Sequence, residues 1–149
     1  AAPAGQPQAI ALDELVAATL APYRDHSHVT VEGPKVALNR QCLSSLALVL
    51  HEWATNSVKY GALCGENHEG QADGGTGLTV RWQVGDDGLA LEWDEIGRAD
   101  QKPEETPRGF GSLLVETSVR QLMGEVRSEV AGRSFRLRMK LPASVLARD

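Results

Sequence analysis

Residues 78–93 read LTVRWQVGDDGLALEW, and the fold of the surrounding chain can be inferred outward from this stretch. Its apolar side chains recur at every second position on both sides of the Asp86-Asp87-Gly88 triplet, at Leu78, Val80, Trp82 and Val84 and then at Leu89, Leu91 and Trp93. Alternation with a period of two is typical of strands that bury one face, and Asp-Gly is a strong turn signal. The stretch therefore predicts a β-hairpin.

The strongest helical pattern precedes the hairpin, in residues 40–60. Its apolar residues recur at spacings of three and four, at Leu43, Leu46, Val49, Leu50, Trp53 and Val58. Gly61 supplies a helix stop. Two further helices are predicted, one from Leu12 to Pro22 and one that opens at Gly109 and ends at Met123-Gly124.

Short strands are expected around the helices, at 29–32, 35–38, 126–130 and 135–141. Helices and antiparallel strands mixed in this order predict an α+β fold, a two-layer α/β sandwich with one helical layer over one sheet. We expect a linker or tail at 1–9, one domain at 10–142 and a second tail at 143–149. Two glycine-rich or charged loops, 64–77 and 96–108, interrupt the domain.

Composition excludes several classes of partner. The 149 residues carry a net charge of -5, which speaks against nucleic acid as a partner. No stretch of about 18 apolar residues and no signal peptide occurs, so we expect a cytoplasmic domain without direct membrane contact. Two cysteines, Cys42 and Cys64, are too few for a disulfide framework. The chain begins without Met, which suggests a piece of a longer protein.

Three polar segments are candidates for chemistry. On a helix, Glu52, Asn56 and Lys59 fall on one face, where oxygen ligands could hold Mg²⁺ and the ammonium could meet phosphate. Gly109 and Gly111 flank Phe110 at a helix start, where backbone N–H groups can approach a phosphate. On spacing alone, a solvated polar face is the more common explanation of the first segment. A lone G-x-G is a weak signal, because a simple loop-to-helix junction also produces it.

The third segment is residues 93–97, Trp93-Asp94-Glu95-Ile96-Gly97, at the end of a predicted strand. A carboxylate beside a glycine turn could accept a hydrogen bond from an adenine amino group. A pair of carboxylates there could equally form an ordinary exposed turn.

Taken together, these segments resemble the HWE histidine kinases. Residues 51–63, HEWATNSVKYGAL, are similar to the family's N-box, and residues 93–95 match its Trp-x-Glu motif. Residues 109–114, GFGSLL, resemble its glycine-rich G2 box, and Gly124-Glu125-Val126 follows at a familiar distance. The similarity covers roughly residues 10–142 and implies the GHKL (Bergerat-type) ATPase fold, with a mixed sheet, helices on one face and ATP between the two layers.

The resemblance also implies roles for single residues. Asn56 and Glu52 would bind Mg²⁺, and Glu52 is the implied catalytic residue, as a base or an orienting group. Lys59 would contact phosphate, and Tyr60 would pack near the nucleotide. Glu95 matches the acid that reads the adenine amino group.

The glycine-rich segments complete the implied nucleotide site. Gly97 would give the base close access. The implied phosphate contacts come from the G2 box, at Gly109, Phe110, Gly111, Ser112 and Leu113. One departure stands out, because the family continues from Trp-x-Glu with Gly-Gly-Pro, whereas Gly97 is followed here by Arg98-Ala99-Asp100.

The implied function is that of the ATP-binding catalytic domain of a two-component sensor histidine kinase. With ATP and Mg²⁺, it would phosphorylate a histidine on a dimerisation hairpin that lies outside this chain, for relay to an aspartate of a response regulator. Its partners would be its own dimerisation domain and that regulator. The alternatives are a docking module of the same fold that does not bind ATP, and a GHKL serine kinase.

Overall fold

The computed structural model describes residues 9–24, 28–60, 76–97 and 110–147. The strands are β1 (Ala9–Ala11), β2 (Val29–Glu32), β3 (Ala37–Asn39), β4 (Gly77–Gly85), β5 (Gly88–Ile96), β6 (Glu125–Ala131) and β7 (Ser134–Leu141). The helices are α1 (Leu12–Leu20), α2 (Leu43–Tyr60) and α3 (Phe110–Gln121). The described residues also form the 3₁₀ turns η1 (Ala21–Tyr23), η2 (Arg40–Cys42) and η4 (Ala143–Val145).

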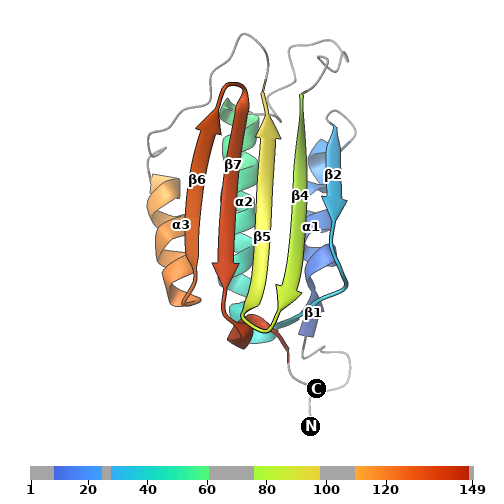
Figure 1. Cartoon of the computed structure of the whole chain (residues 1–149), viewed down its shortest axis with the longest axis vertical. Coiled ribbons are helices and arrows are strands. Elements are labelled where there is room, and N and C mark those ends of the chain that lie inside the picture. The colour runs from blue at the N-terminus through green and yellow to red at the C-terminus, as the bar shows by residue number, and fades with distance from the viewer. Residues whose placement is uncertain (1–8, 25–27, 61–75, 98–109, 148–149) are drawn as a thin grey trace.

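Five strands form one mixed sheet in the order β2-β4-β5-β7-β6. Strands β2 and β4 are parallel, and the other neighbours in this sheet are antiparallel. Figure 1 shows the three helices on one side of the sheet, with α2 behind β5 and β7 and α1 behind β4 and β2. The expected α+β sandwich, with a mixed sheet covered by helices on one face, is confirmed.

The predicted hairpin is β4 and β5, paired from Gly77 with Ile96 to Gly85 with Gly88, so only Asp86 and Asp87 form the turn. The alternation decides the burial, because the inward residues of both strands are almost completely buried against the helices, except Val84 beside the turn, which is 42% exposed. Strand β5 runs to Ile96 and is longer than the apolar pattern predicts. Its last inward side chain, Glu95, is a carboxylate, which is why the pattern alone ends the strand early.

The helix predicted over 40–60 begins as the 3₁₀ turn η2 and becomes α-helical at Leu43. Asn39 caps this turn, since its side-chain oxygen accepts a hydrogen bond of 2.9 Å from the Gln41 amide. Cys42 is buried there, as the sequence predicts for a small core residue, and burial raises the pKa of its thiol. The apolar face of α2 then packs on the sheet through Leu46, Val49, Leu50, Trp53 and Ala54.

A two-stranded sheet, β1 with β3, lies at the end of the molecule where β5 begins and β7 ends (Figure 1). The sequence patterns do not predict β1, because three residues are too few to show a period. After β7 the chain returns through η4, and Leu146 forms a bridge with Leu38 of β3. The segment 143–147 therefore contacts the strand that leads into α2.

The end of α3 places two adjacent residues under opposite constraints. Met123 has a φ of 62°, the left-handed conformation that glycine usually supplies at a helix end. Gly124 follows it, and a Cβ there would lie 2.5 Å from the Lys140 carbonyl oxygen and 2.4 Å from Leu141 Cδ2. The glycine is thus needed for the close approach to β7, and the methionine takes the strained backbone.

We expect Met123→Gly to raise the free energy of unfolding by about 0.5–1 kcal/mol. Relief of left-handed strain is worth about 1–2 kcal/mol, and the extra freedom of glycine in the unfolded chain cancels part of it. Gly124→Ala should lower the same quantity by about 1–3 kcal/mol through overpacking against backbone. Urea denaturation of both variants measures the two changes, and a destabilised Met123→Gly variant would contradict this account.

Candidate functional site

The two adjacent carboxylates near the end of β5 point to opposite faces of the sheet. Asp94 faces outward and pairs with Arg136 of β7, whereas Glu95 faces the helices and is 2% exposed. The alternation of a strand imposes this separation, since successive side chains leave the pleat on opposite sides. The sequence left open whether the pair forms an ordinary exposed turn, and the structure shows that Glu95 is not part of one.

Glu95 is held by hydrogen bonds on both of its oxygens. The Ser57 hydroxyl of α2 donates to Oε1 at 2.9 Å, and the Trp93 indole N–H of β5 donates to Oε2 at 2.8 Å. Ser57 and Trp93 are themselves fully buried. Carboxylates are almost never buried to this extent unless they are partnered, so the arrangement accounts for the burial of Glu95.

Helix α2 and strand β5 make a second contact one helical turn before Ser57. The rings of Trp53 on α2 and Trp93 on β5 pack edge to face, with centroids 5.5 Å apart and an interplanar angle of 64°. Four residues of helix advance about 6 Å and two residues of strand about 6.6 Å, so both contacts can form at once. The pairs Trp53–Trp93 and Ser57–Glu95 therefore fix the register of α2 on β5.

The predicted polar stripe of α2 lies on the flank that faces α3. Glu52 and Asn56 are half-buried and Lys59 is exposed. Ser45, on the same flank at helical spacing, lies 3.5 Å from Gln121 of α3 between Oγ and Oε1. The stripe thus lies on the side of α2 that faces α3, with its first two residues half-buried and its last one open to solvent.

The start of α3 falls at the level of this stripe. Helices α2 and α3 run in opposite directions (Figure 1). Phe110 precedes Gln121 by eleven residues, and Asn56 follows Ser45 by eleven. Because both helices rise about 1.5 Å per residue, the N-terminus of α3 lies near the height of Asn56. A helix start there could offer backbone N–H groups to a phosphate.

Gly97 follows β5 and is tied to the turn between β6 and β7. The Gly97 N–H donates to the Arg133 carbonyl oxygen at 3.0 Å, and Arg133 Nε donates to the Gly97 carbonyl oxygen at 2.9 Å. The residue is buried, yet a Cβ added to it would meet nothing nearer than that Arg133 oxygen at 3.8 Å. Sterics within the described part of the fold thus leave room for a methyl group.

Several predicted site residues are only partly covered by the structure. Gly109 lies outside the described residues. For Tyr60, Phe110, Gly111 and Ser112 the structure gives the helical backbone alone, whereas the Leu113 side chain is 57% exposed on α3. Glu52 and Asn56 lie on the same helix as Ser57, and the hydrogen bond from Ser57 to Glu95 places that part of the helix beside the end of β5.

Ser57 and the Trp93 indole were not singled out from the sequence. One signal was present, since Ser57 lies four residues after Trp53 on the apolar face of α2, where a hydroxyl needs a buried partner. The identity of that partner could not be read from the pattern. It sits 38 residues away on another element.

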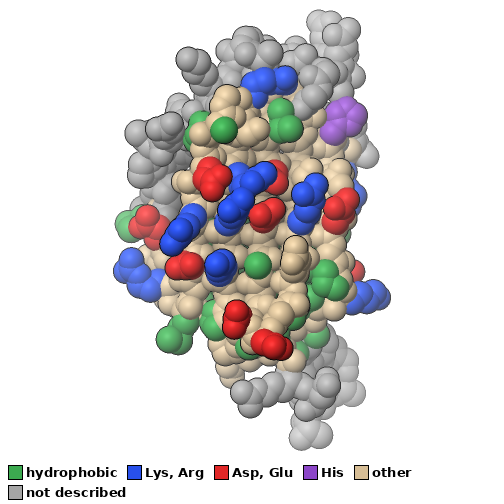
Figure 2. All heavy atoms as spheres, in the orientation of Figure 1, with side chains coloured by type: hydrophobic (Ala, Val, Ile, Leu, Met, Phe, Trp, Pro, Cys, Tyr) green, Lys and Arg blue, Asp and Glu red, His purple; other side chains and the backbone are tan. Residues whose placement is uncertain are grey.

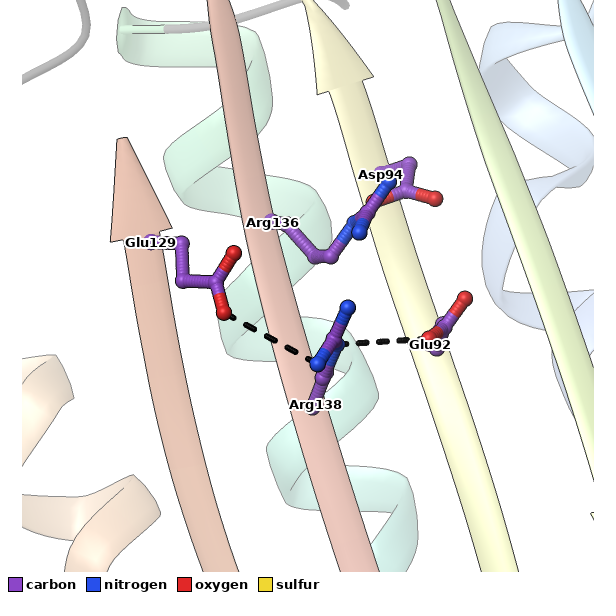
Figure 3. Close-up of polar contacts among 5 residues, drawn as sticks. All are labelled: Glu92, Asp94, Glu129, Arg136 and Arg138. Carbon is purple, nitrogen blue, oxygen red and sulfur yellow. Dashed lines mark hydrogen bonds and ion pairs between the residues drawn. The ribbon is translucent and has the colours of Figure 1, made fainter. Parts of the chain in front are cut away.

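The open face of the sheet carries a ladder of opposite charges (Figure 2). Arg138 contacts Glu92 at 3.3 Å and Glu129 at 3.8 Å, and Arg136 pairs with Asp94 (Figure 3). The hydrogen bond and the charge of Asp94 raise the pKa of Arg136. Exposed pairs of this kind contribute about 0–1 kcal/mol each, and here they balance one another across the strands.

The polar stripe of α2 offers two oxygen donors of the kind that bind metal ions. Within the described ranges, no group of three or more His, Cys, Asp or Glu side chains lies close enough to hold a metal ion. Glu52 and Asn56 offer one carboxylate and one amide oxygen, which are hard donors suited to Mg²⁺ when phosphate oxygens and water complete the shell. No helix in the described part of the chain is long and apolar enough to cross a membrane.

Comparison with curated proteins finds histidine kinases. The chain is 33% identical over 139 residues to blue-light-activated histidine kinase 1 of Erythrobacter litoralis, covering 91% of this chain and 36% of that protein. It is 27% identical over 136 residues to the blue-light-activated histidine kinase of Rhizobium johnstonii, covering 91% of this chain and 37% of the relative. The chain therefore spans about a third of the length of these relatives. No protein-family profile matches it.

Solved structures give the same result for the fold. The histidine kinase domain of the Erythrobacter litoralis EL346 protein superposes with a TM-score of 0.69 at 17% identity, covering 94% of this chain and 70% of that one. The catalytic domain of histidine kinase ThkA gives 0.65 at 14% identity, covering 91% and 95%. The ATP-binding domain of PrrB from Mycobacterium tuberculosis gives 0.62 at 17% identity, covering 90% and 95%.

The resemblance to histidine kinases is confirmed by these comparisons. The chain therefore belongs among the histidine kinases, and its fold is that of their catalytic domains.

Proposed function

We propose that this chain binds ATP with Mg²⁺ and supplies the γ-phosphoryl group to a histidine on a dimerisation hairpin elsewhere in the same protein, for relay to a response-regulator aspartate. The observation that carries the proposal is the buried Glu95 carboxylate, held by two donors beside the polar flank of α2. An acid fixed at a strand end is suited to read a nucleobase, and the flank is suited to the phosphates.

The roles follow the position of each group along α2. Glu95 would accept a hydrogen bond from the adenine amino group, and Gly97 would leave room for the base. Asn56 and Glu52 would hold Mg²⁺, which when bound neutralises phosphate charge. Lys59, on the last turn of α2, would contact the phosphates together with the amides that open α3. The residues of this chain would thereby position the nucleotide for in-line attack.

The wider assignment also rests on the relatives. Those two proteins are named histidine kinases, and one solved neighbour is named an ATP-binding domain. The HWE subgroup, the cytoplasmic location and the partnership with a dimerisation hairpin and a response regulator belong to this proposal. The sequence Arg98-Ala99-Asp100 after Gly97 favours the alternative of a docking module that does not bind ATP, which the titration below tests.

Calorimetric titration with a non-hydrolysable ATP analogue and Mg²⁺ should give a dissociation constant in the micromolar range, about -8 kcal/mol at 1 μM. Asn56→Ala should weaken this binding by tenfold or more, because it removes a metal-binding oxygen. Gln83→Ala serves as the control, since it removes an exposed amide from the opposite face of the sheet. Absence of binding heat with the unaltered domain would favour the docking module.

Gly97→Ala should weaken nucleotide binding by about tenfold while the melting temperature changes little. The new methyl group would have 3.8 Å to its nearest neighbour among the described residues, so any loss of affinity reports on space needed by the base. Gly85→Ala is the matched control, because nothing lies within 4 Å of its Cβ. Unchanged affinity of the Gly97→Ala variant would show that the base does not approach this position.

Transfer itself can be tested in a longer chain that includes the dimerisation hairpin. We expect radiolabel from γ-labelled ATP to enter an acid-labile, base-stable product, as phosphohistidine does. Glu52→Gln should slow the transfer by about 10²-fold or more, the usual contribution of a positioned acid–base group, and should affect nucleotide affinity less. An acid-stable product would identify a serine kinase instead.

A further inference from the structure

We propose that Ser57 and Trp93 are positioning residues that make this site select a 6-amino purine over a 6-oxo purine. The inference rests on the proposed nucleotide-binding function and specifies how the base would be read. It follows from the hydrogen bonds that hold Glu95 and from the enclosure of all three side chains.

The terminal torsion of a glutamate is broad, so a single contact leaves its carboxylate free to turn. Glu95 accepts hydrogen bonds from two different elements. Ser57 reaches Oε1 from α2 at 2.9 Å, and Trp93 reaches Oε2 from its own strand at 2.8 Å. Donors on both oxygens fix the plane of the carboxylate and therefore the direction in which it accepts a further bond.

The two donors are held as firmly as the acid. The Trp93 ring is fully buried and packs edge to face on Trp53, and Ser57 is fully buried one helical turn after Trp53. Water has no access to replace either donor, so the loss of one would leave an acceptor buried with fewer partners. Serine has a lower helix propensity than alanine, so Ser57 costs α2 some helix stability, and its hydroxyl donates a hydrogen bond to Glu95 in return.

Selection between purines follows from which groups can face such a carboxylate. The Trp93 indole can only donate, so Oε2 acts as an acceptor, and Oε1 accepts from the Ser57 hydroxyl. The 6-amino group of adenine donates and completes the arrangement. A 6-oxo group would place an acceptor oxygen against an acceptor oxygen, which is unfavourable.

The enclosure of Glu95 strengthens this preference. Both carboxylate oxygens already accept a hydrogen bond inside the fold, Oε1 from Ser57 and Oε2 from Trp93, so they do not stand open side by side. A guanine-type edge, which presents two parallel donors to a carboxylate, needs both oxygens in one open plane. The fixed carboxylate is therefore suited to the single donor of a 6-amino purine.

The test compares ATP with inosine triphosphate, which carries an oxo group in place of the 6-amino group, in calorimetric titrations with Mg²⁺. Unaltered protein should bind ATP at least tenfold more tightly. In Ser57→Ala and in Trp93→Phe, this ratio should fall by about fivefold or more, because ATP binding weakens and inosine triphosphate binding does not.

Two matched variants separate positioning from general loss of structure. Ser118→Ala removes another buried serine hydroxyl, on α3, and Trp82→Phe removes another indole N–H, which donates to the Pro34 carbonyl oxygen at 2.8 Å. Both lie outside the hydrogen bonds that join Ser57 and Trp93 to Glu95, so both should leave the ratio unchanged even if they lower the melting temperature.

Each outcome decides the inference. An unchanged ratio in both Ser57→Ala and Trp93→Phe, or equal weakening of both nucleotides, would overturn it and leave the nucleotide site intact. Equal binding of both nucleotides by the unaltered protein would do the same. No binding of either nucleotide by the unaltered protein would overturn the proposed function, and this inference with it.

Discussion

Two contacts between α2 and β5 determine the arrangement of the site. The Trp53 and Trp93 rings pack together, and one turn further along Ser57 hydrogen-bonds to Glu95. Both contacts can form at once because one turn of helix and two residues of strand advance by nearly the same distance. The contact between the two Trp rings places α2 on the sheet. The hydrogen bond between Ser57 and Glu95 brings residues 51–60 beside the end of β5.

Strand β5 separates two kinds of electrostatics by its alternation alone. Outward-facing Glu92 and Asp94 pair with arginines of β7 on a wet surface, where each pair contributes little to stability. Glu95 faces the helices and is shielded from solvent. Removal of its hydrogen-bond donors would leave a buried carboxylate with fewer partners, which lowers stability. The carboxylate with a functional role is therefore identified by its burial and its hydrogen-bond donors, because β5 carries several carboxylates and only their environments differ.

The direction of the elements gathers the candidate site at one end of the molecule. Helix α2 and strand β5 both end there, while α3 begins near the height of Asn56, as its antiparallel run from Gln121 requires. The C-terminal turn of α2 carries Lys59, which suits the negative end of its helix dipole, and the start of α3 presents the positive end of its own. Strand β1, which pairs with β3, lies at the opposite end of the fold (Figure 1).

The sequence by itself determined the hairpin, the long helix and the mixed α+β class, because alternation and three- to four-residue spacing report which face of each element is buried. The motif resemblance also pointed to histidine kinases before any coordinates. Tertiary structure alone decided that Asp94 and Glu95 part to opposite faces and that Ser57 holds the acid, since strand length past the apolar pattern and helix-to-strand register are not local properties. Likewise, a left-handed Met123 could not be read from a Met-Gly pair, because the demand for glycine at position 124 comes from β7, sixteen residues away.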